Sequence, residues 1–194
     1  MSRRTTSLTP ADFAGYYATE ADPWGFATSP YEKAKYAATL EALPKAHYRS
    51  GLEIGCSIGI LTGHLAGRCD EMLGLDVVPS ALETARRNCA GTPNARFALV
   101  AVPGEWPEGR FDLMVLSEVL YFLDRADLAR LAGRVEAALE PGGDVILVHW
   151  LGETNFPLSG DDAAEGFAAA ASFLQLVRRE RTADYRLDVL TRPA

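Results

Sequence analysis

Short apolar runs alternate with longer segments of helical spacing from about residue 51 to residue 150. The apolar runs predict buried strands, and the segments between them are long enough to form crossover helices. Strands that alternate with helices form a parallel sheet. The pattern therefore predicts an α/β fold with a doubly wound, mostly parallel sheet, whose strands lie at 51–54, 71–76, 95–101, 111–116 and 144–150.

Two segments carry the Ser-x-x-Glu pattern of a capping box, in which each side chain satisfies a free backbone amide of the other residue. Ser29–Glu32 predicts the start of a helix that runs to Leu43, because Pro44 cannot extend a helix. Ser80–Glu83 predicts the start of a second helix.

The second half of the chain adds a helix and a hairpin. Apolar residues at steps of three and four predict an amphipathic helix at 124–139, ended by Pro141-Gly142-Gly143. After residue 150 we expect a helix and two strands joined by a polar link at 182–184, so that the chain ends in an antiparallel hairpin. These three elements lie at 161–171, 173–178 and 185–191.

The start of the chain has a different character. The first 28 residues crowd aromatic side chains among small and polar ones. Such a segment packs on the main body or closes over a binding site as a lid. Since no linker or repeat interrupts the rest, we predict one domain over 1–194, with 1–45 as a helical and aromatic lid segment.

Charge and composition exclude several classes of protein. A formal charge of −7 disfavours non-specific binding to nucleic acid, which needs cations to neutralise phosphates. The longest apolar runs are far shorter than the roughly 20 residues of a membrane span, and the start resembles no signal peptide, so we expect a cytoplasmic protein. The three cysteines, Cys56, Cys69 and Cys89, lack metal-site spacing, which predicts reduced thiols and no metal site.

A glycine turn follows the first predicted strand. Gly55-Cys56-Ser57-Ile58-Gly59 stands where a strand passes into a helix, which is where open α/β sheets bind ligands. Small residues there let the backbone approach a ligand, and free amides attract anionic groups. Asp76 ends the second strand, in the position where a carboxylate accepts both hydroxyls of a ribose. The two features together predict a nucleoside site.

The spacing of the turn helps to choose the nucleoside. A dinucleotide turn needs G-x-G-x-x-G, whereas Gly55–Gly59 has the form G-x-x-x-G with Ser57 in the middle. Here the sequence resembles the class I S-adenosylmethionine-dependent methyltransferases, whose first motif is E/D-x-G-x-G-x-G and whose second ends in an acid. That resemblance implies a Rossmann-like fold. Ser57 departs from the pattern by replacing the central glycine.

Further stretches narrow the resemblance. The segment 111–123, FDLMVLSEVLYFL, resembles the fourth strand and following loop of that class. With Asp22–Phe26 (DPWGF) and Ser29–Tyr36 (SPYEKAKY), the chain is similar to the nodulation protein S (NodS)-like branch over roughly residues 20 to 150. Members of that branch that methylate chitooligosaccharides act on the amino group of a deacetylated sugar, but the stretch after His149 is much less similar.

The resemblance implies a set of residues around the cofactor S-adenosyl-L-methionine. The glycine turn lies beside its methionine part, Asp76 holds the ribose, and backbone near Val102 and Pro103 meets the adenine. Lys35 reaches the cofactor carboxylate, and aromatic residues near the start of the chain close over the site. The implied cofactor-binding residues are Gly55, Cys56, Ser57, Gly59, Asp76, Val77, Val102, Pro103, Ser117, Tyr16, Trp24, Lys35 and Tyr36.

Three residues are candidates for work on the methyl acceptor. Methyl transfer needs an aligned and deprotonated nucleophile, so one nearby base would suffice. His149 follows the fifth strand and is the histidine predicted at the active-site mouth, unless it makes a structural hydrogen bond. Glu118 offsets the positive charge of the cofactor or orients an amine, unless its side chain is simply exposed to solvent. Tyr121 stacks on or hydrogen-bonds to the acceptor, unless it only packs in the core.

The leading hypothesis is therefore methyl transfer to nitrogen or oxygen of a small polar acceptor, such as an aminosugar. A non-catalytic S-adenosylmethionine-binding regulatory protein is the alternative from another class. An NAD-dependent oxidoreductase is a third interpretation, disfavoured because the dinucleotide glycine pattern is not evident. The acceptor and the oligomeric state do not follow from the sequence.

Overall fold

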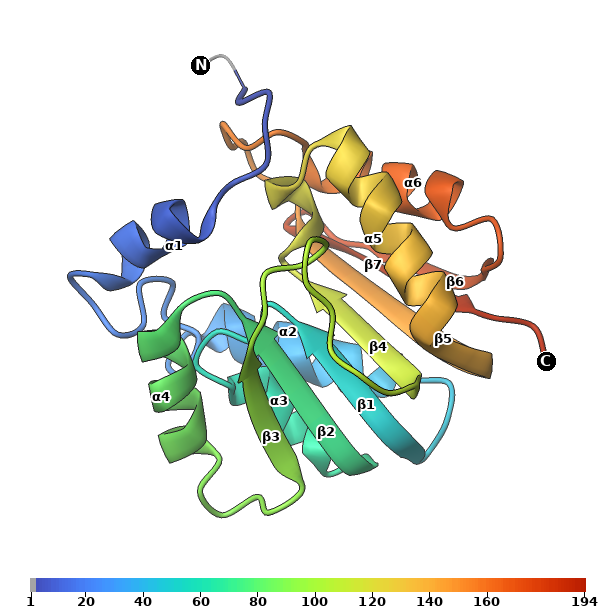
Figure 1. Ribbon diagram of the computed structural model, residues 1–194, viewed down its shortest axis with the longest axis horizontal. Coiled ribbons are helices and arrows are strands. Elements are labelled where there is room, and N and C mark those ends of the chain that lie inside the picture. Colours follow the sequence, from blue (N-terminus) through green and yellow to red (C-terminus); the bar gives the residue numbers. More distant parts are fainter. Residues whose placement is uncertain (1–2) are drawn as a thin grey trace.

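The computed structural model describes residues 3–194, which form one seven-stranded sheet with helices on both faces (Figure 1). The strand order is β3-β2-β1-β4-β5-β7-β6. The first five of these pair in parallel and β7 is antiparallel to both β5 and β6. The strands are β1 (Tyr48–Ile54), β2 (Cys69–Asp76), β3 (Ala95–Leu99), β4 (Phe111–Ser117), β5 (Leu139–Trp150), β6 (Gln175–Arg181) and β7 (Tyr185–Thr191).

This architecture confirms the predicted doubly wound, mostly parallel sheet and the antiparallel hairpin at its end. The polar link at 182–184 joins the hairpin strands, and the hydroxyl of Thr182 accepts from the amides of Asp184 and Tyr185. The second strand of the hairpin, β7, inserts between β5 and β6. The reason is its composition, since Leu187, Val189 and Leu190 are buried whereas most of β6 is exposed.

Helices cover both faces of the sheet. Helices α2 and α3 pack on one face, and α5 and α6 pack on the other (Figure 1). Residues 100–110 link β3 to β4 through turns, and this described segment contains no helix. The helices are α1 (Pro10–Tyr17), α2 (Pro30–Glu41), α3 (Ile60–Ala66), α4 (Pro79–Asn88), α5 (Arg125–Ala138) and α6 (Gly160–Ala170), with a short 3-10 helix, η1 (Leu120–Phe122).

Two helix starts test the capping predictions. Ser29 is the N-cap of α2 and its hydroxyl accepts from the amide of Glu32, as predicted. The prediction for α4 is wrong at Ser80, because the N-cap is Val78 and Pro79 already occupies the first turn. Proline is favoured there because it has no amide to satisfy.

Helix α5 and strand β5 meet earlier than predicted. The helix ends at Ala138, and β5 begins at Leu139 and includes the Pro-Gly-Gly segment. Gly142 takes a positive φ of 73°, and its amide donates to the carbonyl of Arg192 at 2.9 Å. The Pro-Gly-Gly segment therefore forms the irregular first part of β5. The sequence pattern predicts a turn there instead.

Candidate active site

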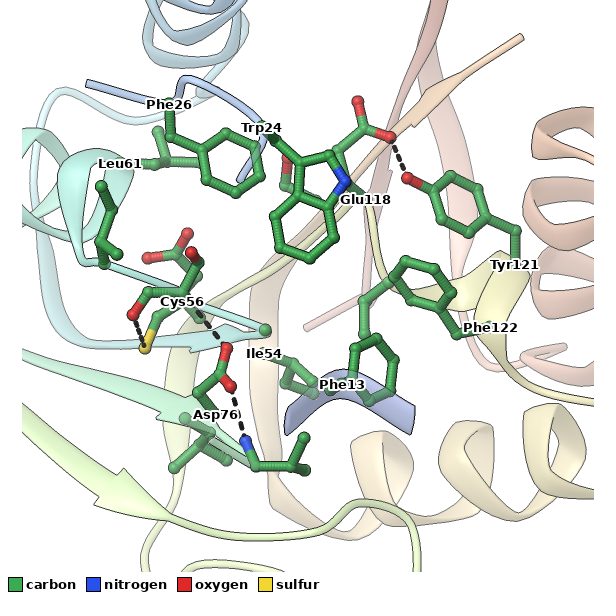
Figure 2. A pocket seen from close by; sticks show the side chains of 18 of the residues that line it. Phe13, Trp24, Phe26, Ile54, Cys56, Leu61, Asp76, Glu118, Tyr121 and Phe122 are labelled. Carbon is green, nitrogen blue, oxygen red and sulfur yellow. Dashed lines mark hydrogen bonds between the residues drawn. The ribbon is translucent and has the colours of Figure 1, made fainter. Parts of the chain in front are cut away.

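A cavity of about 460 Å³ opens at the carboxyl ends of the parallel strands. Its wall combines the turn after β1, the end of β2 and the loop after β4 with residues from α1, α2 and the segment between them. Figure 2 shows Asp76 on one side of this cavity and Glu118 on another, with the rings of Phe13, Trp24 and Phe26 around them. Its volume lies within the range of small-molecule sites.

The turn between β1 and α3 forms one wall. Gly55 and Gly59 have φ of 77° and 78°, and Ser57 between them has φ of 49°. The amides of Gly55 and Cys56 both donate to the carbonyl of Leu75 on β2, at 2.8 Å each. Serine in the left-handed region is uncommon, but it occupies the position that the class fills with glycine. Ser57 thus adopts the left-handed conformation at a position where glycine would adopt it without strain.

Asp76 is held rigidly at the end of β2. Its Oδ2 accepts from the amide of Ser57 at 2.8 Å, and its Oδ1 accepts from the amides of Val77 and Val78 at 2.7 and 2.9 Å. Burial raises the pKa of Asp76, and the three amides act in the opposite direction. The carboxylate therefore lines the cavity in a fixed orientation, directly beside the turn.

Glu118 is the centre of a hydrogen-bonded network after β4. Its Oε1 accepts from Lys35 Nζ at 2.6 Å, and its Oε2 accepts from the hydroxyl of Tyr121 at 2.8 Å and from the amide of Trp150 at 2.9 Å. The backbone of Glu118 has φ of 57°. The alternative of a solvated glutamate is wrong for Glu118, since three donors hold its carboxylate. Figure 2 shows the bond from Tyr121.

Lys35 is held between two carboxylates. Its side chain is 2% exposed, and Nζ donates to Glu32 at 2.9 Å as well as to Glu118. Two carboxylates therefore already engage the ammonium group that was predicted to reach the cofactor carboxylate. The three charged groups stabilise one another in the interior, because burying any one of them without an opposite charge would be costly.

The segment before α2 covers the turn with aromatic rings. The hydroxyl of Tyr17 lies 2.5 Å from Oγ of Ser57, and the ring centroids of Tyr17 and Trp24 are 5.4 Å apart. Asp22 shapes this segment, because its carboxylate accepts from the amides of Phe26 and Ala27 at 2.8 and 2.9 Å. The DPWGF motif is thus a tight turn that presents Trp24 and Phe26 to the cavity.

His149 lies away from the cavity. It is fully buried, and its Nε2 accepts from the amide of Leu120 at 3.2 Å. Its side chain is covered by η1 and by the start of α6, where Gly160 approaches the His149 Cβ. Burial lowers the pKa of His149 to about 4. The structure supports the structural hydrogen bond and not the position at the active-site mouth.

Three other predicted residues also lie outside the cavity wall. Gly59 packs against Ala85 of α4, the carbonyl of Pro103 accepts from Arg134 on α5, and Tyr16 is 41% exposed. The remaining predicted residues are brought together in the wall. They are Gly55, Cys56, Ser57, Asp76, Val77, Val102, Ser117, Trp24, Lys35, Tyr36, Glu118 and Tyr121.

Several residues of the wall were not predicted. Tyr17 was not singled out, although it follows Phe13 by four residues on α1 and both side chains line the cavity. Tyr31 and Glu32 lie within the SPYEKAKY motif, and Glu53 begins the E-x-G motif, so both motifs held a signal for them. Phe156 lies in the loop after β5, where no pattern indicates which side chain turns inward.

Glu53 makes the free energy of unfolding depend on pH. Burial raises the pKa of Glu53 to about 8, and its Oε2 accepts from the hydroxyl of Thr62. A carboxyl with a raised pKa in the folded state stabilises the fold fully below its unfolded pKa of 4.5, and this stabilisation is lost as pH rises toward 8.

We therefore expect Glu53→Gln to gain stability relative to the wild type between pH 5 and pH 8, by about 3 kcal/mol. Urea unfolding at pH 5, 6.5 and 8 measures the difference. Glu71→Gln, an exposed change on β2, is the control and should show no such trend. A constant difference between Glu53→Gln and the wild type over this range would contradict the assignment.

Among residues 3–194 there is no cluster of three or more His, Cys, Asp or Glu side chains that could hold a metal ion. Within the same described range, each helix falls short of the length and apolar character needed to cross a membrane.

The strand order, the turn with Asp76 beside it, and the cavity at the strand ends define the class I S-adenosylmethionine-dependent methyltransferase fold. Within that class the chain belongs to the nodulation protein S (NodS) family, whose family model matches residues 17–147. The predicted NodS-like resemblance is therefore confirmed.

Curated relatives and solved structures agree with this family. Nodulation protein S of Rhizobium tropici is 33% identical over 127 residues, which are 64% of this chain and 53% of that protein. The chain thus spans about half the length of this relative. A structure described as a putative methyltransferase from Pseudomonas syringae is 38% identical, with a TM-score of 0.73, and covers 84% of this chain and 99% of its own.

One further structure shows the same fold. N-methyltransferase NodS from Bradyrhizobium japonicum WM9 in complex with S-adenosyl-l-homocysteine has a TM-score of 0.84 at 23% identity. The match covers 96% of this chain and 100% of that one.

Proposed function

We propose that the protein transfers a methyl group from S-adenosyl-L-methionine to nitrogen or oxygen of a small polar acceptor, such as an aminosugar. The observation that carries this proposal is the cavity shared by the Asp76 carboxylate, the glycine turn and the Glu118 network. A nucleoside-binding end and a charged, hydrogen-bonded end thus lie in one site. Membership of the NodS family supports the same activity.

The residues present fit the cofactor. Asp76 lines the cavity, and its two oxygens keep lone pairs beyond those that accept from three backbone amides, so the carboxylate can also accept from the cofactor. We assign Asp76 to the ribose, Gly55–Ser57 to the methionine part, and Val77 and Val102 to the adenine. When bound, S-adenosylmethionine supplies an activated methyl carbon.

The chain itself supplies alignment and shielding. The aromatic segment with Tyr17, Trp24 and Phe26 excludes water from the cavity, which is needed because water competes with the acceptor. Glu118, fixed by Lys35 and Tyr121, presents negative charge at the edge of the sheet. Holding the reactants in line accounts for much of the acceleration of such a displacement.

Formation of S-adenosylhomocysteine tests the proposal. The protein is incubated with S-adenosylmethionine and a panel of aminosugar, phenolic and carboxylate acceptors, and the product is quantified by mass spectrometry. Turnover with any acceptor excludes the alternative of a non-catalytic binding protein. Calorimetry that shows no binding of S-adenosylmethionine would overturn the proposal altogether. The cytoplasmic location and the lack of a nucleic-acid partner stay predictions.

A further inference from the structure

Two polar atoms in the cavity wall lack a hydrogen-bond partner. They are the hydroxyl of Tyr31 and Oε2 of Glu32, consecutive residues at the start of α2. The other buried side-chain atoms without a partner in residues 3–194, those of Trp106, His149 and Arg186, belong to residues that do not line the cavity. Buried polar groups are nearly always paired. Both residues line the cavity, so an unpaired hydroxyl and an unpaired carboxylate oxygen in its wall indicate the place of a ligand's polar group.

The charges around this place favour a cationic or hydrogen-donating ligand. Glu32 and Glu118 share the single ammonium group of Lys35, at 2.9 and 2.6 Å, so the ionised cluster carries one surplus negative charge. The side chain of Glu32 is 9% exposed, and burial raises its pKa. A ligand with a positive charge would compensate this cluster, whereas a carboxylate or phosphonate would add to its negative charge.

Much of the remaining cavity wall is apolar and aromatic. The rings of Phe13, Trp24, Phe26 and Phe122 face the cavity (Figure 2). Phe156, in the loop after β5, lines the cavity as well. Phe122 and Phe156 pack edge to face with centroids 4.6 Å apart. A wall of rings suits an apolar or aromatic ligand body, while an oligosaccharide would leave many hydroxyls without partners.

On the basis of the proposed methyl transfer, we propose that Tyr31 and Glu32 bind the reacting group of the acceptor, and that the acceptor is a small primary or secondary amine with an apolar or aromatic body. Glu32 Oε2 faces the nitrogen and the hydroxyl of Tyr31 provides a second contact. Both residues thereby gain the hydrogen bonds that they lack in the structure.

The reaction balances with these residues. The ammonium form of the acceptor gives one proton to the Glu32 carboxylate, which frees the lone pair on nitrogen. The lone pair forms the N–C bond to the methyl carbon while the C–S bond breaks and its electron pair returns to sulfur. The methylated product carries the positive charge as an ammonium ion, and the proton on Glu32 passes to solvent when the product leaves.

A matched pair of probes tests this inference. 2-Phenylethylamine and 3-phenylpropionate differ mainly in the sign of the charged group, and their binding to protein saturated with S-adenosylhomocysteine is measured by calorimetry. We expect the amine to bind at least tenfold more tightly than the acid. Glu32→Gln should reduce this ratio at least tenfold, since a hydrogen bond to a charged group is lost. Tyr31→Phe should weaken amine binding severalfold.

Glu41→Gln, an exposed change in the same helix, should leave the ratio unchanged. The proposal is overturned if the acid binds as tightly as the amine, if neither probe binds, or if Glu32→Gln keeps the wild-type ratio. Tyr31→Phe and the wild-type ratio decide the matter even where Glu32→Gln fails to fold. Failure to bind S-adenosylhomocysteine is a separate result, which contradicts the proposed function.

Discussion

Replacing Asp76 with alanine is expected to weaken the binding of S-adenosylmethionine at least tenfold. A hydrogen bond to a charged group contributes roughly 1.5–3 kcal/mol, and two such bonds to the ribose would be lost. The effect should be increased further because the same carboxylate anchors the amides of Ser57, Val77 and Val78. Titration calorimetry with the cofactor measures the change directly.

Asp70→Ala is the matched control for this prediction. Asp70 lies on the same strand, is exposed, and pairs with His47 at the surface at 2.8 Å. Its removal should leave the affinity within about twofold of the wild type, as surface ion pairs contribute little. If Asp76→Ala folds, as judged by thermal unfolding, and binds the cofactor normally, Asp76 has no place in the cofactor site.

Gly59→Ala is expected to lower the free energy of unfolding by about 2–5 kcal/mol. The φ of 78° costs any residue with a Cβ about 1–2 kcal/mol, and overpacking adds about 1–3 kcal/mol. The new Cβ would lie 2.8 Å from the Cβ and 3.1 Å from the Cα of Ala85, so helix α4 would have to shift. Urea unfolding followed by circular dichroism gives the value.

Gly55→Ala provides the comparison. Gly55 has nearly the same φ, but an added Cβ would meet only the side chain of Val119, at 3.4 Å. Its loss should be limited to about 1–2 kcal/mol. Equal losses for the two variants would mean that the approach of α4 to the turn does not constrain Gly59.

The central parallel strands β4 and β5 were predictable because most of their residues are buried on both faces. Val145–Val148 is apolar without interruption, as a central strand requires, and β4 has the same character. The early start of β5 was not predictable, because Pro141 and two glycines have the composition of a turn. Pairing with Arg192, far along the chain, makes that segment part of the strand.

The candidate site was predictable where local spacing determines it. The glycine turn and Asp76 are a short-range pattern, and both lie in the cavity wall. The position of His149 depends on η1 and α6, which cover its side chain, and spacing along β5 contains no information about them. The ion pair of Lys35 with Glu118 was not predictable for the same reason, because the two residues are 83 positions apart along the chain.

Two segments outside the range of the family model meet at the rim of the cavity. Leu8, Pro10 and Phe13 precede residue 17, Thr154 and Phe156 follow residue 147, and all five line the cavity. The segments also hold each other, since the amide of Arg4 donates to the carbonyl of Asn155 at 2.8 Å. A change in the shape of this rim would therefore have to alter both segments together, and a chimera that exchanged only one of them with a relative would lose their fit to each other.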